Sequence, residues 1–387
     1  MNSDNGQVAA GKAGPEVFLH IGMMKTGTSY LQQVLQRNAE ALERDGVFVR
    51  HANGGGGMRE AMLDILHSEA PATSDGGWAR LVRKARAHEG GKVIISSELL
   101  SFVKDERAQQ IVASFQPSRV TVIITARDLV RIIPSAWQEK IKHGGRLAFD
   151  RFVDGVVDEN GPQRVKRIFW TRYDLGVIVR RWVAAAGVDR VVVVTVPDRK
   201  ASPSLLWERF AAVCGLSSDG YDLSLNQGSN LSLGYAQAEL VRLLNLRFRG
   251  GEQWPECQRV IQQMLARDVL RPDPKKPASV ERPVLSPAQH DWAVGKSREL
   301  AEQAAASGVR VVGSLAELVP AAMTEAEKQA ALAAVPPQTP EMYVDVIAAL
   351  IAQLAGTTVP AASDDEDELD DLDDETSERP RRKARRR

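Results

Sequence analysis

The chain has few cysteines, no long apolar run and no net charge. Cys214 and Cys257 are its only two cysteines, which excludes a framework of several disulfides. No segment approaches the roughly 20 consecutive apolar residues that a membrane-spanning helix needs. The first residues, Met1 to Gly14, are polar and glycine-rich, unlike the apolar core of a secretory signal. We therefore expect a cytoplasmic protein without a membrane span.

The zero net charge hides an uneven distribution. Residues 364–378 are mostly Asp and Glu, whereas residues 379–387 are mostly Arg and Lys. Without these two blocks the chain is mildly positive, which suits an anionic ligand. Long blocks of like charge cannot bury enough apolar surface to offset the entropy lost on ordering. We expect disorder over residues 1–15 and 357–387, and one folded domain over residues 16–356 that is helical from about residue 235.

Four segments rich in β-branched residues are predicted to be buried strands. They run apolar without alternating, which is typical of parallel sheets covered on both faces, and the chain between them is long enough for crossover helices. The predicted fold class is therefore α/β, with a central, mostly parallel sheet flanked by helices. The four segments are Glu16–Gly22, Lys92–Ser97, Arg119–Ala126 and Arg190–Val196.

Apolar residues at helical spacing predict a helix directly after the first strand. Thr28 and Ser29 are its expected caps, and Asp45-Gly46 is its expected end. Further helices are expected to begin within Val130–Ile141 and to cover Tyr173–Ala186, Tyr235–Leu246, Pro287–Ala306 and Pro340–Leu354.

The turn between the first strand and this helix has the composition of an anion site. Gly22 to Ser29 read G-M-M-K-T-G-T-S. Backbone N–H groups and the helix N-terminus point at a ligand in such a turn, Gly27 allows close approach, and Lys25 adds a positive charge. The turn is not a Walker A loop, because its lysine precedes the last glycine.

His20 to Ser29 closely resemble the 5′-phosphosulfate loop, P-K-[ST]-G-T-[ST], of sulfotransferases that use 3′-phosphoadenosine 5′-phosphosulfate (PAPS). Met24 stands where that family usually has proline. The resemblance implies a P-loop NTPase-like sulfotransferase fold, and it implies that PAPS is the donor. It also implies that Lys25 acts in catalysis and that the donor is bound by Lys25, Thr26, Gly27, Thr28 and Ser29.

A second element resembles the 3′-phosphate site of the same family. The strand that ends at Ala126 is followed by Arg127-Asp128 and then by a helix with Ser135 eight positions after the arginine. Guanidinium binds phosphate bidentately, and a hydroxyl adds one donor. We expect this element to meet the Lys25 loop in space. The looser resemblance, to bacterial members of the superfamily, covers roughly Glu16 to Leu246.

Sulfuryl transfer also needs a base to accept the proton of the acceptor. Glu98 is the candidate, because it follows a predicted strand and strand carboxyl ends line the ligand crevice of open α/β sheets. Several branches of the family have a glutamate in this region and others a histidine. Glu98 could equally serve as an N-terminal helix carboxylate. His51, which opens a glycine-rich stretch, and His20, which we expect to be a core residue, are the rival bases.

The leading hypothesis is a PAPS-dependent sulfotransferase that acts on a hydroxyl or amine and releases 3′,5′-adenosine bisphosphate. One alternative is a nucleotide-dependent kinase with an atypical phosphate loop. The other is a non-catalytic interaction protein acting through its charged tail. We expect a small-molecule, carbohydrate or lipid acceptor, no metal and no specific nucleic acid. The acceptor's identity and the oligomeric state stay open.

Overall fold

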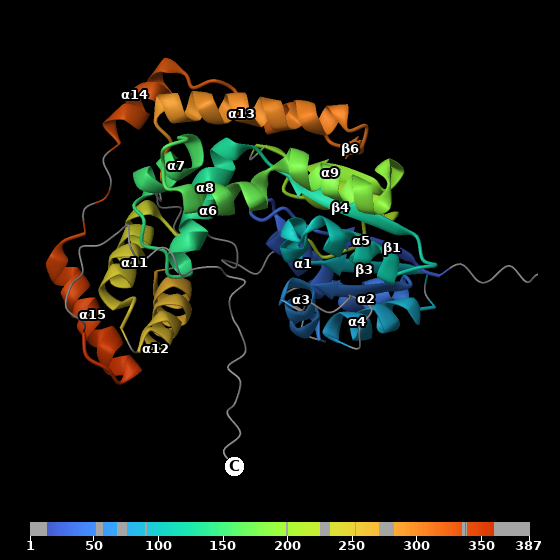
Figure 1. Ribbon diagram of the computed structural model, residues 1–387, viewed down its shortest axis with the longest axis horizontal. Coiled ribbons are helices and arrows are strands. Elements are labelled where there is room, and N and C mark those ends of the chain that lie inside the picture. The colour runs from blue at the N-terminus through green and yellow to red at the C-terminus, as the bar shows by residue number, and fades with distance from the viewer. Residues whose placement is uncertain are drawn as a thin grey trace, which may run out of the picture.

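A computed structural model describes most of the folded chain (Figure 1). The described residues are 14–51, 57–67, 76–89, 91–198, 200–224, 233–251, 253–270, 282–334, 337 and 339–359. The expectations for residues 1–13, for the glycine-rich stretch at 52–56 and for the tail from residue 360 lie outside them. Within the described ranges, the helices are too short or too polar to cross a membrane.

Six parallel strands form the central sheet, in the order β2-β3-β1-β4-β5-β6. This confirms the predicted α/β class with a parallel sheet. The strands are β1 (Glu16–His20), β2 (Val47–His51), β3 (Lys92–Ser96), β4 (Val120–Ala126), β5 (Val191–Thr195) and β6 (Arg310–Val312).

The sequence predicted the four inner strands and missed the two edge strands. The middle of β2 is half-exposed and includes Arg50, so its apolar run is broken. The other edge strand, β6, has only three residues, all at least partly exposed. Edge strands carry too little burial to show the continuous apolar signal of a central strand.

Helices cover both faces of the sheet (Figure 1). On β1, Val17 and Leu19 face one layer, and Phe18 faces the other. The Phe18 face is covered by α1 (Thr28–Arg37), α2 (Ala39–Arg44) and α10 (Leu205–Cys214). The Val17 face is covered by α3 (Met58–His67), α4 (Gly77–Arg86), α5 (Asp105–Ser114) and α9 (Leu175–Ala186).

The rest of the chain forms a largely helical half beside the carboxyl ends of the strands (Figure 1). Its long helix α13 crosses over both halves, packing on α9 and on α6. The helices of this half are α6 (Leu129–Lys142), α7 (Phe149–Val157), α8 (Gln163–Tyr173), α11 (Tyr235–Phe248), α12 (Trp254–Arg259), the π-helix η3 (Val260–Val269), α13 (Pro287–Ala306), α14 (Glu325–Ala333) and α15 (Glu341–Ala355). Short 3₁₀ turns are η1 (Glu98–Phe102), η2 (Val188–Arg190) and η4 (Leu315–Leu318).

Two predicted helices are each divided by a polar residue. The helix expected to run to Asp45-Gly46 is two helices that meet at Asn38, whose side-chain amide donates to the carbonyls of Val34 and Asp222. The helix expected over Tyr173–Ala186 begins only after Asp174, whose carboxylate caps α9 by accepting from the Val177 N–H. Asn and Asp side chains compete for backbone hydrogen bonds in this way, so they favour helix ends.

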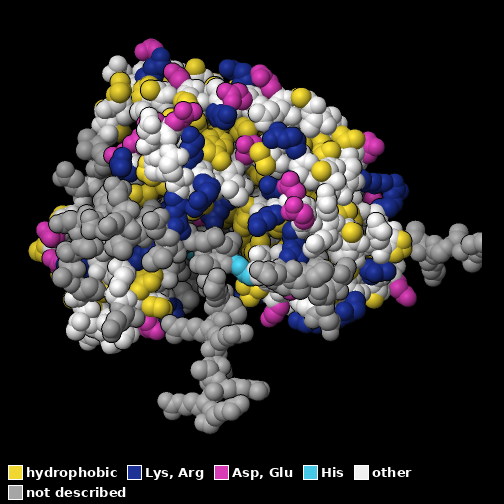
Figure 2. Space-filling model, viewed as in Figure 1, with side chains coloured by type: hydrophobic (Ala, Val, Ile, Leu, Met, Phe, Trp, Pro, Cys, Tyr) yellow, Lys and Arg dark blue, Asp and Glu magenta, His cyan; other side chains and the backbone are white. Residues whose placement is uncertain are grey.

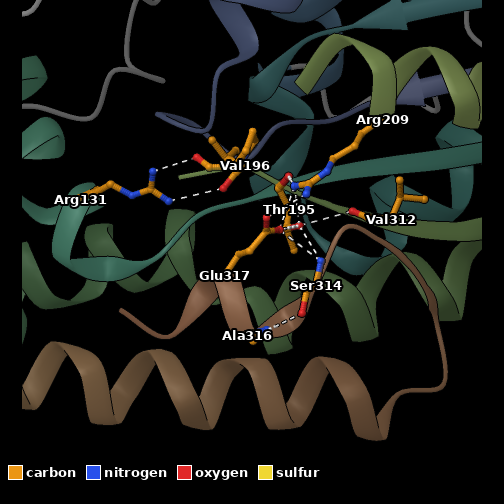
Figure 3. A network of polar contacts seen from close by, with 9 residues as sticks. Arg131, Thr195, Val196, Arg209, Val312, Ser314, Ala316 and Glu317 are labelled. Carbon is orange, nitrogen blue, oxygen red and sulfur yellow. Dashed lines mark hydrogen bonds and ion pairs between the residues drawn. The ribbon is translucent and has the colours of Figure 1, made fainter. Parts of the chain in front are cut away.

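A polar network fastens the segment after β6 to the carboxyl end of β5 (Figure 3). Arg209 on α10 donates to both carboxylate oxygens of Glu317, at 2.8 Å each. The same guanidinium donates to the Thr195 carbonyl at 2.7 Å, and the Thr195 hydroxyl donates to Glu317 at 2.5 Å. Burial alone raises the pKa of Glu317, but the hydrogen bonds from Arg209 and Thr195 outweigh it and lower the pKa. The network therefore stabilises the fold while Glu317 is ionised.

We predict that Glu317→Gln lowers the free energy of unfolding by about 1–3 kcal/mol at pH 7, because it replaces charge-assisted hydrogen bonds of a partly exposed pair. A carboxylate with a lowered folded-state pKa stabilises the fold above its unfolded pKa of about 4.3, and this contribution is lost as the pH falls through the folded value. The difference from wild type, measured by urea denaturation, should shrink below about pH 4. A difference that is constant from pH 7 to pH 3 would contradict this assignment.

Candidate functional site

The loop between β1 and α1 is fixed along the end of β4. The N–H of Ile21 donates to the Ile123 carbonyl at 3.0 Å, and the N–H of Met23 donates to the Thr125 carbonyl at 2.8 Å. The Thr125 N–H returns a bond to the Gly22 carbonyl at 2.6 Å. The loop thus extends the pairing of β1 with β4 beyond the sheet before it turns into the helix.

The backbone of the loop turns sharply at Lys25 and Gly27. Lys25 has φ of 59°, and it is the one non-glycine residue in the described part of the chain with positive φ. Such a conformation costs an L-residue about 1–2 kcal/mol and often marks a functional turn. Gly27 has φ of 85°, and a Cβ there would come within 2.5 Å of Leu206 on α10. Glycine is therefore required where the loop enters α1.

The N-terminus of α1 has no cap of its own. Its N-cap is Gly27, which makes no side-chain hydrogen bond, and the first turn holds no acidic residue. The prediction that Thr28 and Ser29 are caps was wrong, because Thr28 is already the first helical residue. First-turn N–H groups and the helix dipole favour an anion at this end.

Thr26 does not offer its side chain to a ligand. It is fully buried, and its hydroxyl donates to the Met23 carbonyl at 2.5 Å while lying 2.6 Å from the Thr125 hydroxyl. Any ligand contact by Thr26 must use its backbone N–H. Ser29, by contrast, is exposed at the start of α1.

Lys25 forms an ion pair with Glu139 on α6, with 2.8 Å between Nζ and Oε2. Burial alone raises the pKa of Glu139, but a hydrogen bond with His143 and the charges of Lys25 and Lys142 outweigh it and hold the pKa well below its usual range. The Glu139 carboxylate is therefore ionised at neutral pH. It competes with any bound anion for the ammonium group of Lys25.

Arg127 brings the second predicted element against the loop. One Nη of its guanidinium donates to the Lys25 carbonyl at 3.1 Å. Ser135 lies on α6 one turn before Glu139 and donates back to the Arg131 carbonyl at 2.9 Å. The two segments meet as the sequence predicted, although they are about a hundred positions apart. Asp128 pairs with Arg131 and caps α6, so it is not the partner of Arg127.

Lys and Arg side chains are visible near the centre of the face drawn in Figure 2. They lie around a hollow between the half that holds the sheet and the helical half. A cavity of about 720 Å³ adjoins Ser135 on the α6 side, with mostly apolar walls that include Val130, Pro134, Leu285 and Met323. Its volume is in the range of small-molecule sites.

Glu98 lies on the opposite side of the loop. A Cβ on Gly22 would approach its Cβ to 2.9 Å and its Cα to 3.0 Å, so the loop begins directly against it. Its carboxylate accepts a hydrogen bond from Gln32 at 3.0 Å. Glu98 is also the first residue of η1, so both the base and the helix-end carboxylate suggested by the sequence fit this position.

The two histidines differ in their surroundings. His20 is fully buried, as expected of a core residue, and both of its ring nitrogens have hydroxyl partners. His51 ends β2 in register with Ser96, and its Nδ1 has no hydrogen-bond partner within the described residues. Burial and, to a smaller extent, the charge of Arg50 lower the pKa of His51. His20 could accept a proton from a ligand only after one of its hydrogen bonds, to Ser96 or to Thr125, had broken.

Two residues of this site were not predicted from the sequence. Glu139 and Gln32 belong to no recognisable motif, and their partners Lys25 and Glu98 lie on other elements. In the described part of the chain, no three His, Cys, Asp or Glu side chains are grouped so that they could hold a metal ion.

Comparison with known proteins returns only a weak likeness to solved structures. No family model matches the chain, and no curated protein matches it. A solved sulfotransferase from Alicyclobacillus acidocaldarius is similar over 56% of this chain and 88% of its own, with 16% identity and a TM-score of 0.40. A likeness at that level adds nothing to what the residues themselves indicate.

We predict that Glu139→Gln tightens the binding of 3′,5′-adenosine bisphosphate by about three- to tenfold, because it removes the carboxylate that competes for Lys25. Isothermal titration calorimetry measures the change. Glu325→Gln, which breaks the exposed pair with Lys328 on α14, is the matched control and should leave the affinity unchanged. Weaker binding by Glu139→Gln would mean that Glu139 supports the anion site instead of competing with it.

Proposed function

We propose that the chain is a sulfotransferase that moves the sulfuryl group of PAPS to a hydroxyl or amine acceptor. The observation that supports the proposal best is the hydrogen bond from Arg127 to the Lys25 carbonyl, because it holds the guanidinium beside the loop. In the proposal, the guanidinium binds the 3′-phosphate and the loop binds the 5′-phosphosulfate. PAPS carries a phosphate at the 3′ position and a phosphosulfate at the 5′ position of one ribose. Arg127 and the loop must therefore lie within the span of one nucleoside to bind both groups.

The loop would hold the 5′-phosphosulfate through backbone N–H groups of Thr26, Gly27 and Thr28, aided by the N-terminal dipole of α1 and the Ser29 hydroxyl. Arg127 would bind the 3′-phosphate bidentately, and Ser135 would add one donor. Thr26 contributes in this scheme by its backbone alone, because its hydroxyl is already bonded inside the protein.

In the transfer step the acceptor oxygen or nitrogen attacks sulfur, and the bond from sulfur to the bridging oxygen breaks. The electron pair of that bond stays on the phosphate of 3′,5′-adenosine bisphosphate. Glu98 takes the acceptor's proton, and Lys25 leaves Glu139 to stabilise the charge that develops on the bridging oxygen. Because that charge is larger in the transition state, Lys25 would act on the rate as well as on binding.

We predict that Arg127→Ala removes the preference for a 3′-phosphate. Loss of charge-assisted bonds should weaken binding of 3′,5′-adenosine bisphosphate by roughly 10- to 100-fold and change binding of 5′-AMP by less than about twofold. Calorimetry without magnesium measures both ligands. Arg80→Ala, an exposed arginine on α4, is the control. Wild-type protein that binds only magnesium-ATP would instead indicate a kinase.

We predict that Glu98→Gln lowers turnover by about 10²- to 10⁴-fold and leaves the affinity for 3′,5′-adenosine bisphosphate within about twofold, because the amide keeps the shape of the carboxylate but cannot accept a proton. Turnover is followed as release of the bisphosphate from PAPS with a panel of sugar, phenol and amine acceptors. If Glu98→Gln keeps full turnover, the base lies elsewhere, and His51→Gln is then the variant to measure.

A further inference from the structure

A continuous chain of hydrogen bonds runs beneath the phosphate loop and ends at Glu98. It passes through α1, β3, β1, β4 and the loop itself, so it joins elements that are far apart in the sequence. The successive bonds are Glu98 to Gln32 (3.0 Å), Gln32 to Ser96 (3.3 Å), Ser96 to His20 (2.8 Å), His20 to Thr125 (3.2 Å), Thr125 to Thr26 (2.6 Å) and Thr26 to the Met23 carbonyl (2.5 Å).

The inner members of this chain are out of contact with water. His20, Ser96, Thr125 and Thr26 are fully buried, and Gln32 is 1% exposed. A buried polar group that loses its partner costs about 1–3 kcal/mol, so each member depends on its neighbours keeping their orientation. The chain therefore behaves as a unit and not as separate contacts.

The proton of each member can be assigned from the loop end of the chain. The Thr26 hydroxyl gives its single proton to the Met23 carbonyl, so it must accept from Thr125. The Thr125 proton is then used, so Thr125 must accept from the Nε2–H of His20. A neutral histidine with a proton on Nε2 has an acceptor at Nδ1, which takes the proton of Ser96.

The other end of the chain is fixed by the same reasoning. Ser96 has given its proton to His20, so it accepts from the side-chain amide of Gln32. An ionised carboxylate is only an acceptor, so the second proton of that amide goes to Glu98. The Gln32 amide thus donates in both directions: one proton goes to Glu98, and from the other proton onward every donor points toward the loop. Every bond has one donor and one acceptor.

We propose that Gln32, held in this orientation by Ser96 and His20, is the positioning residue for Glu98. The role of Glu98 as the base rests on the proposed function. The direction of the hydrogen bonds from Gln32 to Thr26 does not depend on that function. Because α1 begins at the phosphate loop and carries Gln32 one turn further on, the loop and the carboxylate of Glu98 are tied to the same helix. The hydrogen bond from Gln32 is to one carboxylate oxygen of Glu98, so the other oxygen is the one that would take the acceptor's proton.

The state of His20 agrees with this arrangement. Burial lowers the pKa of His20 to about 3, so the ring is neutral at physiological pH. A second proton on the ring would turn Nδ1 into a donor, and the Ser96 hydroxyl would then lose the acceptor for its own proton. His20 is thus a positioning residue and has no free nitrogen to act as a base.

The first experiment needs no substrate. Nitrogen-15 NMR of the histidine rings in the wild-type protein, with His20→Gln to assign the signals, should show His20 neutral and protonated at Nε2 from pH 6 to pH 8. A proton at Nδ1, or a charged ring in that range, would reverse the order of donors and overturn the proposal. If His20→Gln does not fold, a coupling between Nδ1 and the Ser96 hydroxyl proton, which only the hydrogen bond donated by Ser96 produces, supplies the same assignment.

The second experiment separates rate from binding. Gln32→Leu, which keeps the size of the side chain, should lower kcat by roughly 10- to 100-fold, and Ser96→Ala, which only frees Gln32, by roughly three- to tenfold. The Kd for 3′,5′-adenosine bisphosphate should change by less than about twofold in both. Gln36→Leu, an exposed position on the same helix, is the control and should change neither quantity.

Failure of the positioning role and failure of the proposed function give different results. If wild type binds the bisphosphate and turns over PAPS while Gln32→Leu keeps its kcat, the positioning role is wrong and the function stands. An equal loss of kcat and affinity in Gln32→Leu would mean a structural role only, which also contradicts the proposal. If wild type neither binds the bisphosphate nor turns over PAPS, the proposed function fails, and the role of Gln32 toward Glu98 as a base fails with it.

Discussion

The backbone pairing of the loop with Thr125 sets the geometry of the whole site. Thr125 holds Gly22 and Met23 by its main chain, and its hydroxyl contacts both Thr26 and His20. Arg127 lies two residues further along the chain, so the contact that fixes the loop also sets where the guanidinium can reach. Displacement of the end of β4 would therefore disturb the loop, Arg127 and the buried hydrogen-bond chain together.

Charge at this site is balanced within the protein. Lys25 is paired with Glu139, whose lowered pKa keeps it ionised, while Arg127 is turned toward a backbone carbonyl. An anion bound on the loop would replace one carboxylate as the partner of Lys25. Separating Lys25 from Glu139 would cost free energy and so reduce the affinity for an anion. In the proposed transfer reaction, the released ammonium could then move to the charge that develops on the bridging oxygen. The ion pair thus links the strength of binding to the freedom of Lys25.

Local pattern was sufficient for the features that lie close together in the sequence. The four inner strands are buried on both faces, so they read as unbroken apolar runs, and the loop from Gly22 to Ser29 is contiguous. Edge strand β2 was missed because its half-exposed middle breaks that run. Glu139 and Gln32 were missed because each meets its partner only after helices α6 and α1 have packed, across 114 and 66 positions.

The sequence by itself determined the α/β class, the order of loop and helix after β1, and the charged side chains available for an anion. It did so because apolar periodicity and turn chemistry act over a few residues. Only the tertiary structure decided that Lys25 pairs with Glu139, that the Thr26 hydroxyl faces inward and that Glu98 is held by Gln32. These contacts join separate elements, and their partners are chosen by how parallel strands and their helices pack, which no local pattern encodes.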